Sequence, residues 1–143
     1  MRAFFRDSNE PIDADVLLHN HVLYRRLPMD GYQPYLDELT QQRGYLAQDE
    51  VALSPSTPNL ELVLKKFDAE HHHDDDEVRF VLEGEGVFDI RALDERWLRV
   101  VLEPGDRLVV PKGKHHRFDL TQSQTIRCVR LFKDPAGWAA IYR

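Results

Sequence analysis

The sequence predicts a mainly β domain, an antiparallel sandwich or barrel with one to three short helices placed mostly toward the N-terminus. Beyond Phe67 the apolar residues recur with a period of two, as they do in half-buried strands. Clusters of Gly, Pro, Asp and Ser divide this region into strand-length runs, spaced by about 8 to 12 residues as in all-β folds. The 143 residues, 42% of them hydrophobic, are enough for one domain with a buried core.

The N-terminal segment, residues 1–54, is weakly patterned. A short strand is predicted at His21–Leu27. A helix is predicted at Pro34–Arg43, because proline favours the first helical turn and Gly44 is a typical helix end. A second helix is indicated by apolar residues that share one helical face: Leu60, Val63, Leu64 and Phe67.

Six strands are predicted after the second helix. Val78–Glu83 and Val87–Arg91 flank a Gly-rich turn, Gly84-Glu85-Gly86, which favours a β-hairpin. The remaining strands are expected at Trp97–Leu102, Arg107–Pro111, His116–Leu120 and Thr125–Phe132.

Composition excludes several function classes. Nineteen Lys and Arg against 25 Asp and Glu give a formal net charge of −6, so we expect neither nucleic acid nor membrane as a partner. Cys128 is the single cysteine, which excludes an internal disulfide and a multi-cysteine zinc site. The charged N-terminus, Met1–Asp15, does not look like a signal peptide, and a cytoplasmic location is expected.

A run of histidines and carboxylates, Glu70–Glu77, carries the chemistry. On an extended strand His71, His73 and Glu77 share one face, while His72 points the other way. Two imidazoles and a carboxylate on one face form the facial triad that binds Fe(II)-type ions and leaves coordination positions open. Asp75 has the same parity as Glu77, so parity alone does not choose between them. A solvated acidic loop is the alternative interpretation.

Two spacings resemble the paired motifs of the cupin superfamily. The first motif runs from His71 to Glu77, and six residues separate Glu77 from Gly84. The second motif is Gly105, five residues, Pro111-Lys112-Gly113, two residues and His116, with Leu120 in place of the usual terminal Asn. The resemblance implies a jelly-roll-like cupin β-barrel, Glu77 as the carboxylate ligand, and His116 as a fourth ligand with His115 out of register. It also implies one domain over residues 1–143, with the metal-binding barrel at residues 55–135.

A closer resemblance is to the acireductone dioxygenase family. It rests on four stretches: Lys66–His71, Asp75–Phe80, His116–Phe118 and Arg130–Trp138. In that family the enzyme cleaves 1,2-dihydroxy-3-keto-5-methylthiopentene with O₂ in methionine salvage. The resemblance implies formate and 2-keto-4-methylthiobutyrate as products of an Fe²⁺ form. A Ni²⁺ form would give formate, carbon monoxide and methylthiopropionate.

Two arginines are candidate catalytic residues. Arg79 lies two residues after Glu77 and should point into the same cavity. Arg130 lies in an otherwise apolar strand, where a guanidinium needs an anion. For either arginine that anion is the substrate or a protein carboxylate such as Glu70 or Glu83. The family resemblance makes both arginines site residues.

The other candidates lie close to the first ligand or are aromatic. Glu70 could fix a histidine tautomer, take part in proton transfer as a catalytic residue, or be a surface carboxylate. Asp76 should face away from the metal by parity. Phe67, Phe118 and Trp138 could form an apolar substrate-binding wall for the methylthioethyl tail, or be plain core.

The leading hypothesis is therefore a metal-dependent dioxygenase that takes a small enediol and O₂. Its expected cofactor is Fe²⁺, with Ni²⁺ or Co²⁺ as alternative occupants, because imidazole and carboxylate suit all three ions. A monomer is expected. The alternatives are another metal-dependent cupin, either a small-molecule dioxygenase or an isomerase, and a non-catalytic cupin that binds metal or a ligand.

Overall fold

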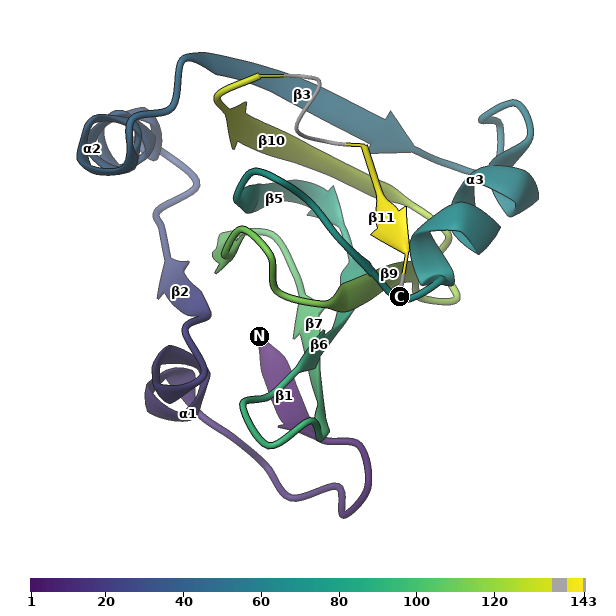
Figure 1. The fold of residues 1–143 in the computed structure, drawn as a ribbon. Coiled ribbons are helices and arrows are strands. Elements are labelled where there is room, and N and C mark those ends of the chain that lie inside the picture. The colour runs from purple at the N-terminus through teal and green to yellow at the C-terminus, as the bar shows by residue number, and fades with distance from the viewer. Residues whose placement is uncertain (135–138, 143) are drawn as a thin grey trace.

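Two antiparallel sheets enclose the core and form a small barrel (Figure 1). The computed structural model describes residues 1–134 and 139–142. One sheet has six strands in the order β1-β7-β6-β9-β4-β11, and the other has five in the order β2-β8-β5-β10-β3. The predicted mainly β, cupin-type fold is confirmed.

The strands are β1 (Arg2–Phe5), β2 (Leu23–Arg26), β3 (Ala47–Leu53), β4 (His71–His72), β5 (Glu77–Gly84), β6 (Gly86–Arg91), β7 (Trp97–Leu102), β8 (Asp106–Val110), β9 (His116–Leu120), β10 (Ile126–Phe132) and β11 (Ile141–Tyr142). The helices are α1 (Ala14–His19), α2 (Gln33–Arg43) and α3 (Leu60–Asp68). None of the described helices is both long and apolar enough to cross a membrane.

The predicted hairpin around Gly84-Glu85-Gly86 is wrong. β5 pairs with β8 and β10, whereas β6 pairs with β7 and β9, so the chain crosses from one sheet to the other at this turn. Gly84 has a φ of +74°, and a Cβ there would lie 2.0 Å from the carbonyl oxygen of Thr125. Glycine is therefore required for the close approach of β5 to β10 at this corner.

The N-terminal segment contributes three edge strands: β1 in the six-stranded sheet, and β2 and β3 at the two edges of the five-stranded sheet. β1 pairs with β7, β2 with β8, and β3 with β10. The strand predicted at His21–Leu27 is confirmed as β2, whereas β1, β3 and the six-residue helix α1 were not predicted. The helix predicted at Pro34–Arg43 is confirmed as α2, and Gly44 ends it with a φ of +75°.

Side chains of both sheets meet in the inner core, and α2 covers an outer one. Phe88 and Ile90 of β6 pack there with Val81 of β5 and Leu108 of β8. On the outer face of the five-stranded sheet, α2 packs Leu36 and Leu39 against a second cluster that includes Phe80, Val109 and Val129. Each large apolar side chain buried in this way stabilises the fold by about 1.5–3 kcal/mol.

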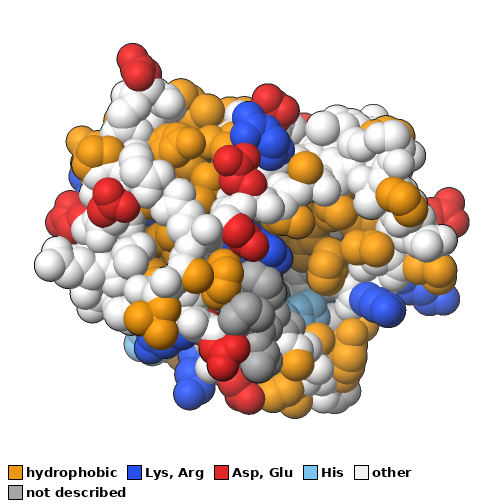
Figure 2. Space-filling view, turned by 90° about the horizontal axis from the view of Figure 1, so that it is seen from above, with side chains coloured by type: hydrophobic (Ala, Val, Ile, Leu, Met, Phe, Trp, Pro, Cys, Tyr) orange, Lys and Arg blue, Asp and Glu red, His pale blue; other side chains and the backbone are white. Residues whose placement is uncertain are grey.

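The predicted amphipathic helix is confirmed as α3, which lies over one end of the barrel rather than inside its core. Leu60 is buried, but Phe67 is 40% exposed. Figure 2 views this end and shows a hollow lined largely by hydrophobic side chains, with a histidine inside it.

Candidate metal centre

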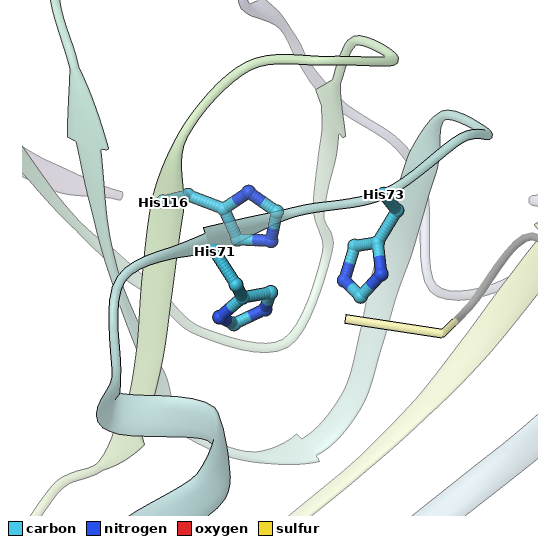
Figure 3. Close-up of side chains that lie close together, drawn as sticks. All are labelled: His71, His73 and His116. Atoms are coloured by element: carbon cyan, nitrogen blue, oxygen red, sulfur yellow. The ribbon is translucent and has the colours of Figure 1, made fainter. Parts of the chain in front are cut away.

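Three histidines, two from one short segment and one from a distant strand, meet inside the barrel (Figure 3). His71 of β4 and His116 of β9 are register partners in the six-stranded sheet, and each is only 2% exposed. His73 lies in the turn that leads into β5. One donor atom from each imidazole lies within 4.8 Å of the other two, a separation that one ion can bridge.

Backbone carbonyls orient two of these rings. The Nδ1–H of His71 donates to the carbonyl of Ala69 at 2.6 Å, and the Nδ1–H of His116 donates to that of Lys114 at 2.9 Å. Because a carbonyl only accepts, the proton sits on Nδ1 and each Nε2 keeps a lone pair for a metal. Burial lowers the pKa of His71 and His73, which keeps these rings neutral as ligation requires.

Glu77 brings a carboxylate to the cluster from the start of β5. Its Oε2 lies 2.5 Å from Nε2 of His116, yet within the described residues neither atom has a partner in hydrogen-bonding geometry. Although burial disfavours the carboxylate, Arg79 and His116 hold the pKa of Glu77 well below its usual range. Burial also disfavours the imidazolium of His116, but Glu77 outweighs it and raises the pKa of His116.

The structure shows which of the two carboxylates, Glu77 or Asp75, lies at the cluster, a choice that strand parity leaves open. Asp75 is buried, but its oxygens accept from the backbone N–H groups of Asp76 and Lys133, both at 2.8 Å. Asp76 accepts from Arg43 and Tyr45, also at 2.8 Å. Both carboxylates therefore hold loops together, and Glu77 is the carboxylate placed beside His116.

The two remaining histidines of the motifs, His72 and His115, pack edge to face against each other instead of joining the cluster. The ring centroids of His72 and His115 lie 4.9 Å apart, with the rings nearly perpendicular. Their positions agree with strand parity, which turns His72 away from His71 and His73.

A cavity of about 110 Å³ opens beside the cluster. His71, His73 and Glu77 form its polar floor. Its apolar wall consists of Val51, Leu53, Phe67, Phe88, Phe118, Ile126 and Cys128. Burial raises the pKa of the Cys128 thiol, so this side chain stays neutral.

Arg79 and Arg130 both line this cavity from directly opposite positions on β5 and β10. Arg79 donates from Nη2 to Oε1 of Glu77 at 2.8 Å. Arg130 donates from Nε and Nη2 to the two oxygens of Asp49, at 2.8 and 2.7 Å.

The prediction that Glu70 or Glu83 pairs with one of these arginines is wrong. Glu83 pairs with Arg127 at 3.0 Å, and the carboxylate of Asp49 reaches Arg130 from the neighbouring strand β3. The sequence did not reveal this because β3 was not predicted. The alternation of AQDEVAL at residues 47–53, with every second residue exposed, was the available signal.

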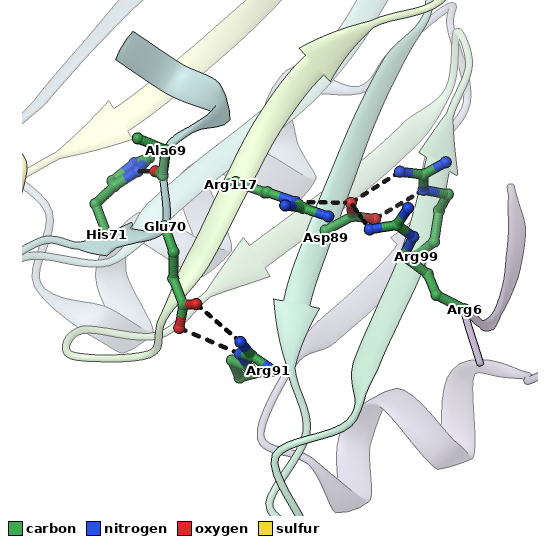
Figure 4. A network of polar contacts seen from close by, with 8 residues as sticks. All are labelled: Arg6, Ala69, Glu70, His71, Asp89, Arg91, Arg99 and Arg117. Carbon is green, nitrogen blue, oxygen red and sulfur yellow. Dashed lines mark hydrogen bonds and ion pairs between the residues drawn. The ribbon is translucent and has the colours of Figure 1, made fainter. Parts of the chain in front are cut away.

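Glu70 is turned away from the histidine ring that it precedes (Figure 4). It accepts from Nη2 of Arg91 at 2.9 Å and from Nε at 3.2 Å, and it is not among the described residues that line the cavity. The acceptor that orients His71 is the carbonyl of Ala69. Ala69, and not Glu70, therefore fixes the tautomer of His71, while the catalytic role expected for Glu70 stays a prediction.

Of the three aromatic candidates, two line the cavity. The ring centroids of Phe67 and Phe118 lie 6.0 Å apart in an edge-to-face arrangement, and Phe118 packs on Phe88. Trp138 lies outside the described residues. Val51 and Leu53 of β3 extend the apolar wall and were not among the predicted site residues.

Comparison with known proteins gives concordant findings. A sequence model of the ARD/ARD′ family matches residues 5–140. Acireductone dioxygenase of Heterostelium pallidum is 45% identical over 143 residues, which cover 100% of this chain and 98% of the relative. That of Dictyostelium discoideum is 43% identical over 148 residues, covering 100% and 99%.

Among solved structures, a similar one is acireductone dioxygenase from Bacillus anthracis with a cadmium ion in its active centre. It superposes with a TM-score of 0.92 at 32% identity, covering 99% of this chain and 97% of the other.

Proposed function

The chain belongs to the acireductone dioxygenase (ARD/ARD′) family, and we propose that it cleaves an acireductone with O₂ at the buried histidine cluster. The enzyme is a metal-dependent dioxygenase. The observation that carries the proposal is the contact between Nε2 of His116 and Oε2 of Glu77. Two buried polar atoms this close, with no hydrogen-bond partner among the described residues, are unfavourable unless a cation is bound by both.

The proposed ligands are His71, His73, His116 and Glu77. Three imidazoles and one carboxylate suit Fe²⁺, which we take as the resident ion, and equally Ni²⁺ or Co²⁺. When bound, the ion supplies Lewis acidity and a template on which an enediol can be oriented for reaction with O₂.

The two arginines would bind the substrate as an anion. The acireductone is an acidic enediol. Arg79 and Arg130 line the cavity from adjacent, paired strands. Positive charge placed there favours loss of the enediol proton and stabilises the electron-rich enediolate that O₂ attacks. Asp49 would act as a positioning residue, because its two-point contact fixes the Arg130 guanidinium plane.

The apolar wall would hold the methylthioethyl tail and exclude water. Phe67 and Phe118 line the cavity together with Val51 and Leu53. Burial of the tail there would leave the polar end of the substrate toward His71 and His73.

The proposed products depend on the ion. The Fe²⁺ form would release formate and 2-keto-4-methylthiobutyrate, whereas the Ni²⁺ form would release formate, carbon monoxide and methylthiopropionate. The protein would present the same ligands, His71, His73, His116 and Glu77, to both ions, so a difference in products would come from the chemistry that each ion supplies. We place the reaction in methionine salvage and in the cytoplasm, with the enediol and O₂ as partners of a monomer.

The test uses protein stripped with a chelator and reloaded with a single metal. Each form is incubated with acireductone without oxygen, air is admitted, and formate and headspace carbon monoxide are measured. We expect formate from both forms and carbon monoxide from the Ni²⁺ form alone. Equal carbon monoxide yields from both forms would remove the dependence of products on the ion.

A further inference from the structure

A second cavity lies on the outer face of the five-stranded sheet, away from the metal centre. It has a volume of about 370 Å³ and is bordered by α1, α2, β2 and β8. In Figure 1, β2 stands between α1 and α2 at this side of the molecule. Arg107 of β8 lines the cavity, whereas the next residue, Leu108, points into the inner core. The sheet therefore separates this cavity from the metal cluster.

Arg107 is a buried cation to which the described residues offer no counterion. It is 8% exposed, its Nε is fully enclosed, and the described residues offer that atom no hydrogen-bond acceptor. Its register partners are Arg25 on β2 and Phe80 on β5, neither of them an anion. Burial and the charge of Arg25 both lower the pKa of Arg107. A guanidinium in such surroundings is unfavourable unless an anion reaches it.

Arg25 brings a second guanidinium to the same cavity. Like charges directly opposite on paired strands repel each other, and here the pair Arg25 and Arg107 shares one face. The guanidinium of Arg25 lies over the ring of Tyr35, 4.8 Å from its centroid. Leu23 of β2 and Leu39 of α2 add apolar side chains to the lining, whereas the side chain of Tyr24 packs against the inner core and donates a hydrogen bond to Asp106.

The acidic residues near the cavity do not neutralise this pair. Asp15 and Glu38 border it, but among the described residues no ion pair joins either of them to Arg25 or Arg107. Glu38 accepts instead from Gln42 on its own helix. The two arginines thus keep their positive charge for a ligand.

We propose that this cavity binds a small organic oxyanion, whose phosphate or carboxylate group is held between Arg107 and Arg25. The planar guanidinium fork matches both groups and donates two hydrogen bonds to either. The rest of the ligand lies against the ring of Tyr35 and the side chain of Leu23. A volume of about 370 Å³ admits an organic group as well as the anion.

The experiment measures binding of phenyl phosphate and of benzoate to the metal-loaded protein by calorimetry at constant ionic strength. The variants are Arg25→Gln, Arg107→Gln and, as a control with the same charge change on the same sheet, Arg127→Gln. Either cavity variant should weaken binding at least about tenfold, because a charge-assisted contact is lost, while the control binds as the wild type does. The ratio of the two affinities identifies phosphate or carboxylate as the preferred group.

Arg25 is exposed, so Arg25→Gln should fold normally even if the buried Arg107→Gln does not. Its oxygen uptake with acireductone should equal that of the wild type, since the cavity lies outside the metal centre. The proposal is overturned if neither probe binds at millimolar concentration, or if Arg25→Gln and the wild type bind both probes equally.

Discussion

At the scale of single residues, five neighbouring histidines differ in what surrounds each ring. His71, His73 and His116 converge inside the barrel, whereas His72 and His115 pack edge to face outside the cluster. The strand period of two accounts for the split between His71 and His72, and the register of β4 with β9 selects His116. Position in the sheet, more than residue type, decides which imidazole can bind a metal.

Substitution of a clustered histidine should remove the metal. We expect His71→Ala, His73→Ala or His116→Ala to weaken metal affinity by more than about 100-fold, because each would lose a direct ligand, which matters more than an outer contact. His72→Ala and His115→Ala are matched controls and should retain metal at wild-type stoichiometry. Metal content after gel filtration, measured by mass spectrometry, checks this. Loss of metal from His115→Ala but not from His116→Ala would show that the register is wrong.

Substitution of Arg130, the register partner of Arg79, should lower turnover and leave metal binding unchanged. Arg130→Ala should keep its metal and lose about 100-fold or more in kcat/KM, because the charge facing the substrate anion is gone. Asp49→Asn should show a smaller loss of about tenfold, since Arg130 keeps its charge but loses the carboxylate that orients it.

Steady-state oxygen uptake and metal analysis on the same samples distinguish the two effects. A metal-free Arg130→Ala, or one with normal kcat/KM, would assign Arg130 to the fold alone.

At the scale of elements, the site depends on strands that come from both halves of the chain. The histidines come from β4, β9 and the turn before β5, while Asp49 and part of the apolar wall come from β3. The sheets are joined at the corner after β5, where Gly84 lets the chain pass close to β10. The corner at Gly84 can be tested by its effect on stability, and so can Asp89 of β6, a buried carboxylate in the six-stranded sheet.

Gly84→Ala should destabilise the protein more than Gly113→Ala does. Both glycines have positive φ, but an added Cβ at Gly84 meets the Thr125 backbone at 2.0 Å, while at Gly113 it meets nothing within 4 Å. Strain alone costs about 1 kcal/mol, and the clash should raise the loss at Gly84 to at least about 2 kcal/mol. Urea unfolding of the two variants checks this. Equal losses would mean that the corner relaxes at little cost.

Asp89 joins the strands of the six-stranded sheet through arginines (Figure 4). It is buried and accepts from Arg99 twice at 2.8 Å, from Arg117 at 3.0 Å and from Arg6 at 3.3 Å. Burial opposes ionisation, but the hydrogen bonds and charges of Arg99, Arg117 and Arg6 together outweigh it and lower the pKa of Asp89. A carboxyl with a lowered folded pKa stabilises the protein above its unfolded pKa of about 3.9, and this stabilisation disappears as the pH falls through the folded value.

Asp89→Asn should therefore lower the free energy of unfolding by roughly 3 kcal/mol at pH 7, where the buried arginine contacts lose their charge partner. The difference from the wild type should shrink below about pH 4. Asp7→Asn, which removes an exposed pair with Arg96, is the control and should have little effect. Denaturant unfolding between pH 7 and pH 3 measures both. A difference that does not vary with pH would mean that the charge of Asp89 is not what stabilises the sheet.

At the scale of the whole molecule, the sequence predicted the strands after Phe67 and the helices α2 and α3 well. Motif spacing and strand parity are local, and they were sufficient to single out His71, His73 and His116. The partners of Arg130 and Glu70 were missed, because Asp49 and Arg91 lie far from them in sequence and are brought there by sheet pairing. The crossing at Gly84 was missed because a period of two is the same whether adjacent strands pair or change sheets.

Oxygen consumption during stepwise addition of Fe²⁺ to apo-protein, with acireductone present, tests the central claim most directly. We expect the rate to rise linearly and to reach a plateau at one equivalent of metal per chain. His115→Ala should reproduce this plateau, and His116→Ala should show almost no uptake at any stoichiometry. Absence of oxygen uptake in the wild type with any metal, or uptake by His116→Ala equal to that of the wild type, would contradict the assignment of dioxygenase chemistry to this cluster.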